Sequence, residues 1–282
     1  MRNKIGIMQG RLSDPMDNNI QSFPVHSWKS EFQKAETIGF ELIEWVFDCK
    51  RNPINNLEGI NEIKSCLQNY DVGINSVCAD YFMEKLLFSV NETNLDNNIQ
   101  ILTNLIKSCH KLEIGIIEIP LVDSSSLKNE SDINEIQKNL ESVLKITEEF
   151  NVILAFETDL PPILFKNFLQ KFNHPNVMAN YDVGNSTANE FDLKNELEIL
   201  KKWIKNIHVK DRLRKGITVP LGTGNTNFDL FFSEIAKISY GGDYVIQGAR
   251  KDLEFLREKP EETCKNYLDF TMQYLDKYVI NI

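Results

Sequence analysis

VILAFE, residues 152–157, is a short apolar run that ends in a carboxylate. Three later runs have the same form and end in an aspartate, a histidine and a glutamine: VMANYD (177–182), IKNIH (204–208) and DYVIQ (243–247). In a closed parallel barrel the carboxyl ends of the strands meet on one face, and that face carries the chemistry of such proteins. We therefore expect Glu157, Asp182, His208 and Gln247 to form one site.

Apolar, β-branched runs recur along the whole chain at fairly even intervals. They begin near Ile5, Leu42, Gly73, Gly115, Val152, Val177, Ile204 and Tyr244. Continuous hydrophobicity is typical of parallel strands that are covered on both faces. Eight strands that alternate with helices predict an α/β fold, a (β/α)₈ TIM barrel with a parallel eight-stranded core, as a single domain over residues 1–282. The first run lacks a Gly-x-Gly-x-x-Gly motif after it, which disfavours a dinucleotide-binding fold.

Helical periodicity separates the predicted strands. One apolar stripe includes Phe32, Ala35 and Ile38 and stops at Gly39, which predicts the end of a helix there. Another stripe starts at Ile133, and Ser131-Asp132 before it is the expected cap.

Size and composition restrict the class of protein. A chain of 282 residues is normal for a barrel of roughly 250 residues. The net charge of −10 disfavours binding to nucleic acid or to an anionic membrane. The sequence has no apolar stretch approaching the roughly 18 residues that cross a bilayer. The five cysteines show no Cys-x-x-Cys spacing, so reduced, mostly buried thiols and a cytoplasmic location are expected.

The four residues at the strand ends have the chemistry of a metal site. Two carboxylates, one imidazole and one amide oxygen form a mostly hard donor set, which favours Mn²⁺ or Mg²⁺ and allows Co²⁺ or Zn²⁺. Such an ion would polarise a substrate carbonyl or hydroxyl. The alternative is that these residues form salt bridges with Arg212 or Arg250. Four such residues on consecutive strand ends favour the metal.

Several motifs together resemble a known family. They are Ile5-Gly-Ile-Met-Gln-Gly-Arg-Leu12, Gly39-Phe-Glu-Leu-Ile-Glu-Trp45, Phe156-Glu157, Asp182-Val-Gly-Asn185, His208-Val-Lys-Asp-Arg212 and Pro220-Leu-Gly-Thr-Gly224. In this order and spacing they resemble the sugar phosphate isomerase/epimerase proteins of the xylose isomerase-like TIM-barrel superfamily. The resemblance runs from the first predicted strand to the eighth.

The resemblance implies specific roles at the strand ends. Glu157, Asp182 and His208 match the metal positions of the family, and Gln247 stands where the family has a glutamate. In the epimerases, the glutamates of the fifth and eighth strands exchange a proton on opposite faces of the substrate through an enediolate. Glutamine cannot take up that proton, so Glu157 is the expected catalytic base and two-base epimerisation by the usual pair is in question.

Other polar residues are candidates for substrate contact. Asn185 stands where the family often has a histidine, and Arg212 approximately matches a substrate-contacting arginine. The further candidates are Glu118 and Asp80, at the predicted ends of the fourth and third strands, and Arg250 after the eighth. Arg212 and the glycine-rich segment 220–225 are also expected to bind an anion, or to form a surface loop.

These observations favour a metal-dependent isomerase or epimerase of a small sugar or sugar phosphate that acts by proton abstraction next to a carbonyl. Alternatives are a dehydratase-like lyase of the same superfamily and a non-catalytic sugar-binding relative, which Gln247 keeps open. Four histidines are too few for the three-zinc cluster of an endonuclease IV-like protein. Barrels of this kind are often homo-oligomers.

Overall fold

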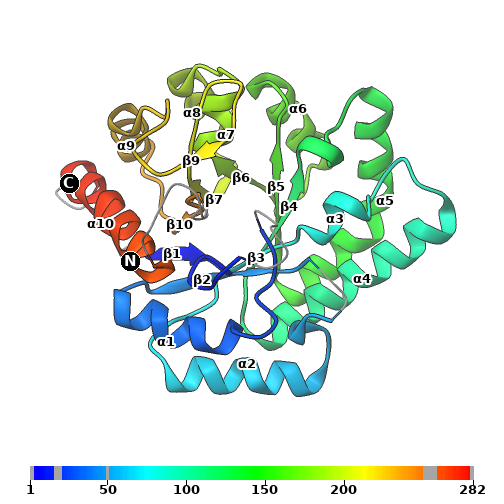
Figure 1. Cartoon of the computed structure of the whole chain (residues 1–282). Helices are drawn as coiled ribbons and strands as arrows, with labels where there is room; N and C mark the ends of the chain where they lie inside the picture. The colour runs from blue at the N-terminus through cyan, green and yellow to red at the C-terminus, as the bar shows by residue number, and fades with distance from the viewer. Residues whose placement is uncertain (1–2, 16–20, 49–50, 250–258, 280–282) are drawn as a thin grey trace.

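A computed structural model of the protein describes residues 3–15, 21–48, 51–249 and 259–279. Eight parallel strands close into a barrel in the order β1-β10-β7-β6-β5-β4-β3-β2 (Figure 1). The barrel strands are β1 (Ile5–Met8), β2 (Leu42–Val46), β3 (Ser76–Cys78), β4 (Ile116–Leu121), β5 (Ile153–Thr158), β6 (Val177–Asp182), β7 (Ile204–Val209) and β10 (Tyr244–Ile246). The predicted (β/α)₈ TIM barrel is thus confirmed.

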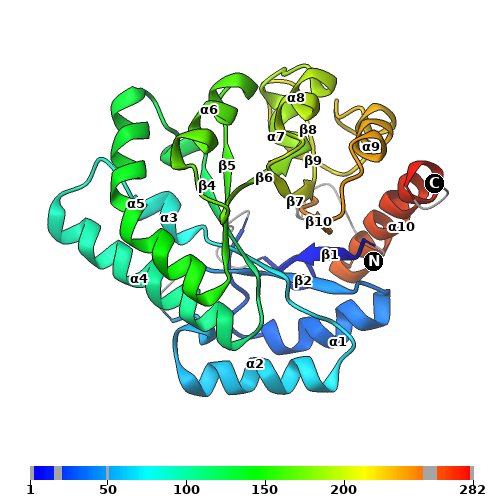
Figure 2. The same cartoon turned by 180° about the vertical axis from the view of Figure 1, so that it is seen from behind.

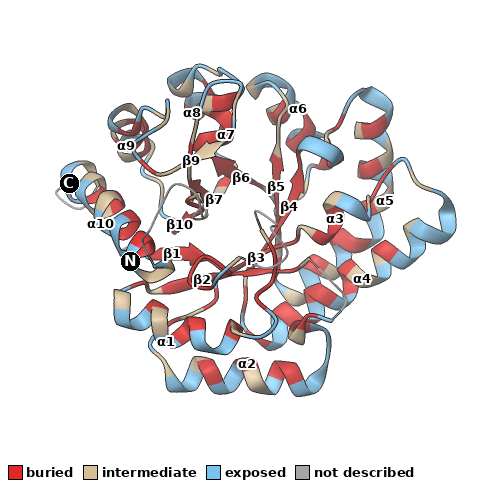
Figure 3. Cartoon of the chain, viewed as in Figure 1, coloured by how far each residue is buried: buried red, intermediate tan, exposed pale blue. Residues whose placement is uncertain are grey.

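Each barrel strand lies where the sequence has an apolar run. The largest offset is at β3, which begins at Ser76, whereas Gly73 pairs with Leu42 as an isolated bridge. The strands are almost entirely buried, because helices cover their outer face (Figure 3). Burial on both faces explains why their hydrophobicity is continuous and not alternating.

Helices surround the barrel, and the view from behind in Figure 2 shows the same ring. They are α1 (Trp28–Ile38), α2 (Leu57–Asn69), α3 (Tyr81–Glu84), α4 (Glu92–Lys111), α5 (Glu130–Phe150), α6 (Pro162–Phe172), α7 (Val183–Ala188), α8 (Leu193–Leu200), α9 (Phe228–Lys237) and α10 (Pro260–Tyr278), with short 3₁₀ turns η1 (Pro53–Asn55) and η2 (Asp123–Ser125). Helix α10 packs against both α9 and α1, so the ring of helices closes where the barrel closes.

Two helix boundaries test the sequence predictions. Helix α1 ends as predicted at Gly39, whose φ of 105° is in the left-handed region that favours glycine. The predicted cap of α5, Ser131-Asp132, is wrong, because the helix begins two residues earlier. The cap of α5 is Asn129, because its side-chain oxygen accepts a hydrogen bond from the backbone N–H of Asp132.

A small antiparallel pair follows β7 and was not predicted. Strands β8 (Asp211–Arg212) and β9 (Thr218–Val219) pair with each other and pack beside α7, at the carboxyl end of the barrel. Two residues per strand are too few to give a hydrophobic pattern, which explains why the sequence does not show them.

Polar side chains lie in the middle of the barrel interior. Glu44, Ser76, Glu118, Asn180 and Asn206 are buried there, on five different barrel strands. Buried polar groups of this kind need hydrogen-bond partners, and several of them bond to each other. They form a layer directly beneath the carboxyl ends of β5, β6 and β7.

The expectation of buried cysteines is confirmed for those that the structure describes. Cys66, Cys78, Cys109 and Cys264 are free and buried, and Cys49 lies outside the described residues. No helix within the described ranges combines the length and the apolar character that crossing a membrane requires.

Candidate metal centre

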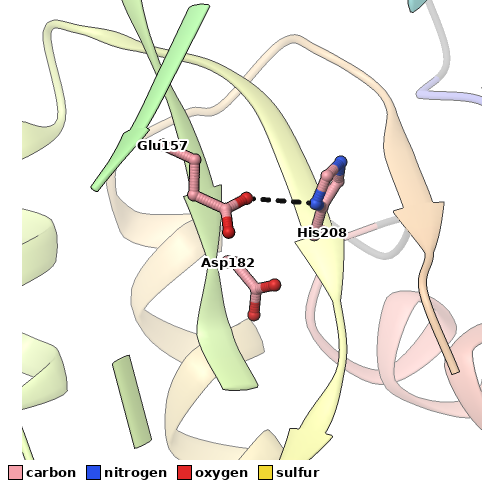
Figure 4. Close-up of side chains that lie close together, drawn as sticks. All are labelled: Glu157, Asp182 and His208. Atoms are coloured by element: carbon pink, nitrogen blue, oxygen red, sulfur yellow. Dashed lines mark ion pairs between the residues drawn. The ribbon is translucent and has the colours of Figure 1, made fainter. Parts of the chain in front are cut away.

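Glu157, Asp182 and His208 lie together at the carboxyl ends of β5, β6 and β7. One ligand atom from each residue lies within 4.8 Å of the others, and all three residues are buried. Figure 4 shows the three side chains directed toward a common space. The structure therefore brings together three of the four residues that the sequence predicts as metal ligands.

Strand geometry explains this convergence. Successive side chains of a strand point to opposite faces, so Asn180 and Asp182 on β6 share the inner face, as do Asn206 and His208 on β7. Asp182 is the register partner of His208. Two neighbouring parallel strands thus deliver a carboxylate and an imidazole at the same height in the barrel.

Hydrogen bonds hold both carboxylates in place. Glu157 accepts from Asn180 Nδ2 at 2.6 Å and from Asn185 Nδ2 at 2.5 Å. Asp182 caps α7, since its Oδ1 accepts from the backbone N–H of Asn185 at 2.8 Å. Its Oδ2 accepts from Lys210 Nζ at 3.1 Å. The motif that follows β6 therefore builds the site with its backbone as well as its side chains.

Both nitrogens of His208 have carboxylate neighbours. Nε2 lies 2.7 Å from Glu44 Oε2, and Nδ1 lies 3.3 Å from Glu157 Oε2. Glu44 is not among the site residues predicted from the sequence. Its signal was a single carboxylate inside the apolar run of β2, a position that is buried in a barrel strand.

Burial and charge shift the pKa values of the cluster. Desolvation would raise the pKa of Glu157, but the hydrogen bond and charge of His208 hold it below its ordinary value. Desolvation raises the pKa of Asp182, against the opposing charge of Lys210. For His208, desolvation is outweighed by Glu44 and Glu157, so its pKa is raised well above the ordinary value. These shifts favour an anionic Glu157 beside a protonated His208.

Gln247 directly follows β10, and its backbone N–H bonds to Val209 O at 3.0 Å. Its Nε2 donates to Gln21 Oε1 at 3.1 Å. Its buried Oε1 has no hydrogen-bond partner among the described residues. An amide oxygen is the only atom by which glutamine can bind a cation, and here that oxygen is unused. The donor set and this orphaned oxygen both fit a divalent metal.

Asn185 and Arg212, which are predicted substrate contacts, lie beside the cluster. Arg212 Nη1 donates to Asn185 Oδ1 at 2.7 Å, and Asn185 in turn bonds to Glu157. The same guanidinium also donates to Gly216 O from Nε and Nη2. These bonds link Arg212 to the catalytic-base candidate through one intervening side chain.

Glu118 and Asp80 are two further carboxyl groups near the cluster. Glu118 is buried within β4 and not at the end of that strand as predicted, whereas Asp80 follows β3 and immediately precedes α3. Neither oxygen of Glu118 has a hydrogen-bond partner within the described ranges, and desolvation together with the charge of Glu157 raises its pKa well above the ordinary value. Asp80 accepts from Gln21 Nε2 at 2.5 Å, and burial raises its pKa to about 6. Gln21 thereby connects Asp80 to Gln247. Arg250 lies outside the described residues.

In the glycine-rich segment after β9, several backbone amides bond to an internal carboxylate. Asp211 Oδ2 accepts from the backbone N–H groups of Gly222 and Gly224, at 2.9 and 2.8 Å. Its Oδ1 accepts from Thr226 N at 3.1 Å. The amides of Gly222, Gly224 and Thr226 therefore already bond to an internal carboxylate, which disfavours the expectation that this segment binds an external anion through them.

The fold and the cluster together define a TIM barrel whose carboxyl-terminal face carries two carboxylates and a histidine. Residues 32–263 match the profile of the xylose isomerase-like TIM barrel family, and the chain belongs to this family. The family resemblance predicted from the motifs is thus confirmed.

Individual relatives agree with this assignment. L-ribulose-5-phosphate 3-epimerase UlaE of Escherichia coli O1:K1 is 24% identical over 232 residues, which covers 78% of this chain and 81% of the relative. The UlaE protein of Escherichia fergusonii is 23% identical over the same length, with the same shares of both chains. Both of these relatives are thus sugar epimerases, in agreement with the family resemblance seen in the motifs.

Solved structures share the fold. D-psicose 3-epimerase from Clostridium cellulolyticum H10 superposes with a TM-score of 0.78 at 17% identity, over 96% of this chain and 99% of that chain. The IOLI protein with a bound zinc atom gives a TM-score of 0.79 at 16% identity, over 98% and 99% of the two chains. At these identities the likeness concerns the barrel itself.

Proposed function

We propose that this protein is a metal-dependent isomerase or epimerase of a small sugar or sugar phosphate. The observation that carries the proposal is the convergence of Glu157, Asp182 and His208 on one buried space at the carboxyl end of the barrel. Its matched relatives, which are L-ribulose-5-phosphate 3-epimerases, favour a keto sugar as the substrate class.

The three converging side chains would hold the ion, with Oε1 of Gln247, which has no hydrogen-bond partner among the described residues, as a fourth donor. The donor chemistry favours Mn²⁺ or Mg²⁺ and allows Co²⁺ or Zn²⁺. When bound, the ion supplies Lewis-acid polarisation of the substrate carbonyl, which acidifies the neighbouring C–H group. The chain itself supplies the proton transfer.

Glu157 is the proposed base. Its lowered pKa keeps it ionised near neutral pH, so it can remove the proton next to the carbonyl and leave an enediolate. Return of that proton by Glu157 to the former carbonyl carbon, with transfer of the hydroxyl proton from the neighbouring oxygen to the former carbonyl oxygen, gives an isomerised sugar. Asn185 and Arg212 lie beside Glu157 and are proposed to bind substrate hydroxyl or phosphate oxygens, with Glu118, Asp80 and Arg250 as further contacts.

Epimerisation needs proton delivery from the opposite face, and Gln247 cannot supply it. Asp80 is the described carboxyl group linked to Gln247, through Gln21. Its pKa of about 6 suits a group that exchanges protons near neutral pH. It is therefore the proposed proton donor if the product is an epimer.

The test is an assay of the metal-loaded protein on a panel of ketoses and ketose phosphates in D₂O. An isomerase or epimerase interconverts sugars with deuterium incorporation next to the carbonyl. Loss of water would instead identify the dehydratase-like lyase. Glu157→Gln should lower the exchange rate by roughly 10²–10⁴-fold. Sugar binding by the wild type without any exchange would show a non-catalytic relative.

A further inference from the structure

Glu44 carries a carboxylate in a buried position, where a charged group is energetically unfavourable. It lies on the inner face of β2, with 1% of its surface exposed, in a strand that is otherwise apolar. A buried carboxylate destabilises a fold unless hydrogen bonds and opposite charge compensate it. Its presence in the barrel therefore calls for a role that an apolar residue would not fill.

One carboxylate oxygen of Glu44 faces the metal cluster, and hydrogen bonds from neighbouring strands hold the other oxygen in place. Oε2 lies 2.7 Å from His208 Nε2. Oε1 accepts from Ser76 Oγ at 2.6 Å and from Asn206 Nδ2 at 2.8 Å. Donors on β3 and β7 thus fix one oxygen, and the other oxygen is aimed across the barrel at the histidine.

This arrangement determines which nitrogen of His208 can bind a cation. A carboxylate only accepts hydrogen bonds, so Nε2 must carry a proton toward Glu44. In a neutral imidazole the lone pair is then on Nδ1, and Nδ1 is the atom that faces Glu157. The ring is held with its ligating atom toward the cluster.

The same buried layer also orients Glu157. Asn206 Nδ2 donates a second hydrogen bond to Asn180 Oδ1 at 2.9 Å. Asn180 Nδ2 donates in turn to Glu157 Oε2 at 2.6 Å. Since Asn206 bonds to both Glu44 and Asn180, one network supports two of the three side chains that converge.

We infer that Glu44 is a positioning residue for the metal centre, which holds His208 in the tautomer and ring orientation that present Nδ1 to the ion. The inference rests on the proposed function, because it assumes that the cluster binds a divalent metal. Partners of this kind that orient a ligating histidine typically change metal affinity by about 10–100-fold when they are removed.

The experiment titrates the full-length metal-free protein with Co²⁺ and with Mn²⁺, and compares the wild type with Glu44→Gln. The substituted amide cannot accept from Ser76, Asn206 and His208 at once, so the ring loses its fixed orientation. We expect the dissociation constant to rise about 10–100-fold. The visible absorption of bound Co²⁺ should also change, since it reports the geometry of the ligands.

Glu196→Gln is the matched control. Glu196 is also a buried carboxylate that accepts from two hydroxyl groups, of Tyr181 and Ser186, but it has no hydrogen bond to the cluster. The control should bind both ions within about twofold of the wild type. A loss of affinity in this variant as large as that in Glu44→Gln would overturn the inference, because any buried charge change would then have the same effect.

Ser76→Ala is a second variant that tests the same inference if Glu44→Gln does not fold. It removes one anchor of Glu44 without touching His208, and we expect a weaker, several-fold loss of affinity. If the wild type binds no metal, the proposed function itself fails. If the wild type binds and both Glu44→Gln and Ser76→Ala match it, only the role of Glu44 is refuted.

Discussion

Gln247 stands where the family resemblance implies a glutamate, at the point where epimerisation would need a second base. We predict that Gln247→Glu binds Mn²⁺ more tightly, because a carboxylate replaces a neutral amide oxygen. We also predict that its native turnover falls at least about tenfold, since a titratable group then faces Gln21 and Asp80. Metal titration and steady-state assays measure the two effects.

A gain of epimerase activity in Gln247→Glu, with substrate binding unchanged, would contradict this prediction. It would show that the site is a degenerate epimerase and that glutamine has no part in a native mechanism. Gln21→Ala is a useful companion, because it removes the partner of Gln247 without adding charge.

Glu196 gives the protein a predictable pH dependence. Burial raises its pKa from 4.5 to about 7, in spite of hydrogen bonds from Ser186 and Tyr181. The folded state therefore holds this proton more tightly than the unfolded chain, and the associated stability, complete below pH 4.5, is lost as the pH rises to about 7. Relative to the wild type, Glu196→Gln should gain roughly 3 kcal/mol in unfolding free energy between pH 4.5 and 8.

Urea unfolding of both proteins at several pH values checks this difference. A stability difference that stays constant from pH 4.5 to 8 would show that Glu196 does not titrate in this range.

At the residue scale, the sequence predicts side chains that end strands better than side chains inside them. Asp182 and His208 end apolar runs, so their convergence follows from the barrel alone. Glu44 sits within such a run, and its partner His208 is 164 residues away in the chain. Contacts across a barrel depend on register and on side-chain direction, which no local pattern shows.

At the scale of elements, the turn from β6 into α7 couples packing to the site. An added Cβ at Gly184 would lie 2.8 Å from Lys210 Cγ and 3.0 Å from Lys210 backbone carbon. Lys210 is paired with Asp182. We predict that Gly184→Ala costs about 1–3 kcal/mol of stability, because the turn must shift, and that it weakens metal binding.

Gly115→Ala is the control for this prediction, because a Cβ there meets no atom within 4 Å. Calorimetric unfolding and metal titration of the two variants should differ clearly. Equal stability in both would mean that the close approach of α7 and Lys210 is readily relieved.

Asp211 organises the segment after β9 through three backbone N–H groups. Asparagine has only one oxygen acceptor, so Asp211→Asn leaves at least one of these part-buried donors without its partner. We expect a loss of roughly 2–4 kcal/mol in urea unfolding and faster proteolytic cleavage near residues 220–226. The exposed Asp229, paired with Lys277, is the matched control, and Asp229→Asn should leave the unfolding free energy nearly unchanged.

Elements with strong patterns could be predicted from the sequence, and short ones could not. All eight barrel strands follow from continuous apolar runs, and the end of α1 follows from Gly39. Strands β8 and β9 have two residues each, so they are too short to show a periodic hydrophobic pattern. The segment after them resembled an anion-binding loop because glycine-rich backbone suits an internal carboxylate as well as an external anion.

At the scale of the whole molecule, a bound ion should stabilise the barrel. The proposed ligands come from β5, β6 and β7, so a bound ion would cross-link three separate strands of the barrel. At a concentration of 100 times its dissociation constant, it adds about 2.7 kcal/mol. We predict that Mn²⁺ raises Tm by roughly 5–10 °C.

The rise in Tm should be larger at pH 8 than at pH 6. The pKa of His208 is raised, so at lower pH a proton competes with the ion for Nδ1. A rise that did not depend on pH would mean that the ion binds without the histidine.

The most direct test of the account is the stoichiometry of Mn²⁺ binding to the metal-free protein, measured by titration calorimetry for the wild type and for Asp182→Asn. We predict one tight site per chain in the wild type and a loss of at least about 100-fold in affinity in the variant. The account is contradicted if the wild type binds no Mn²⁺, or if Asp182→Asn binds it as tightly as the wild type.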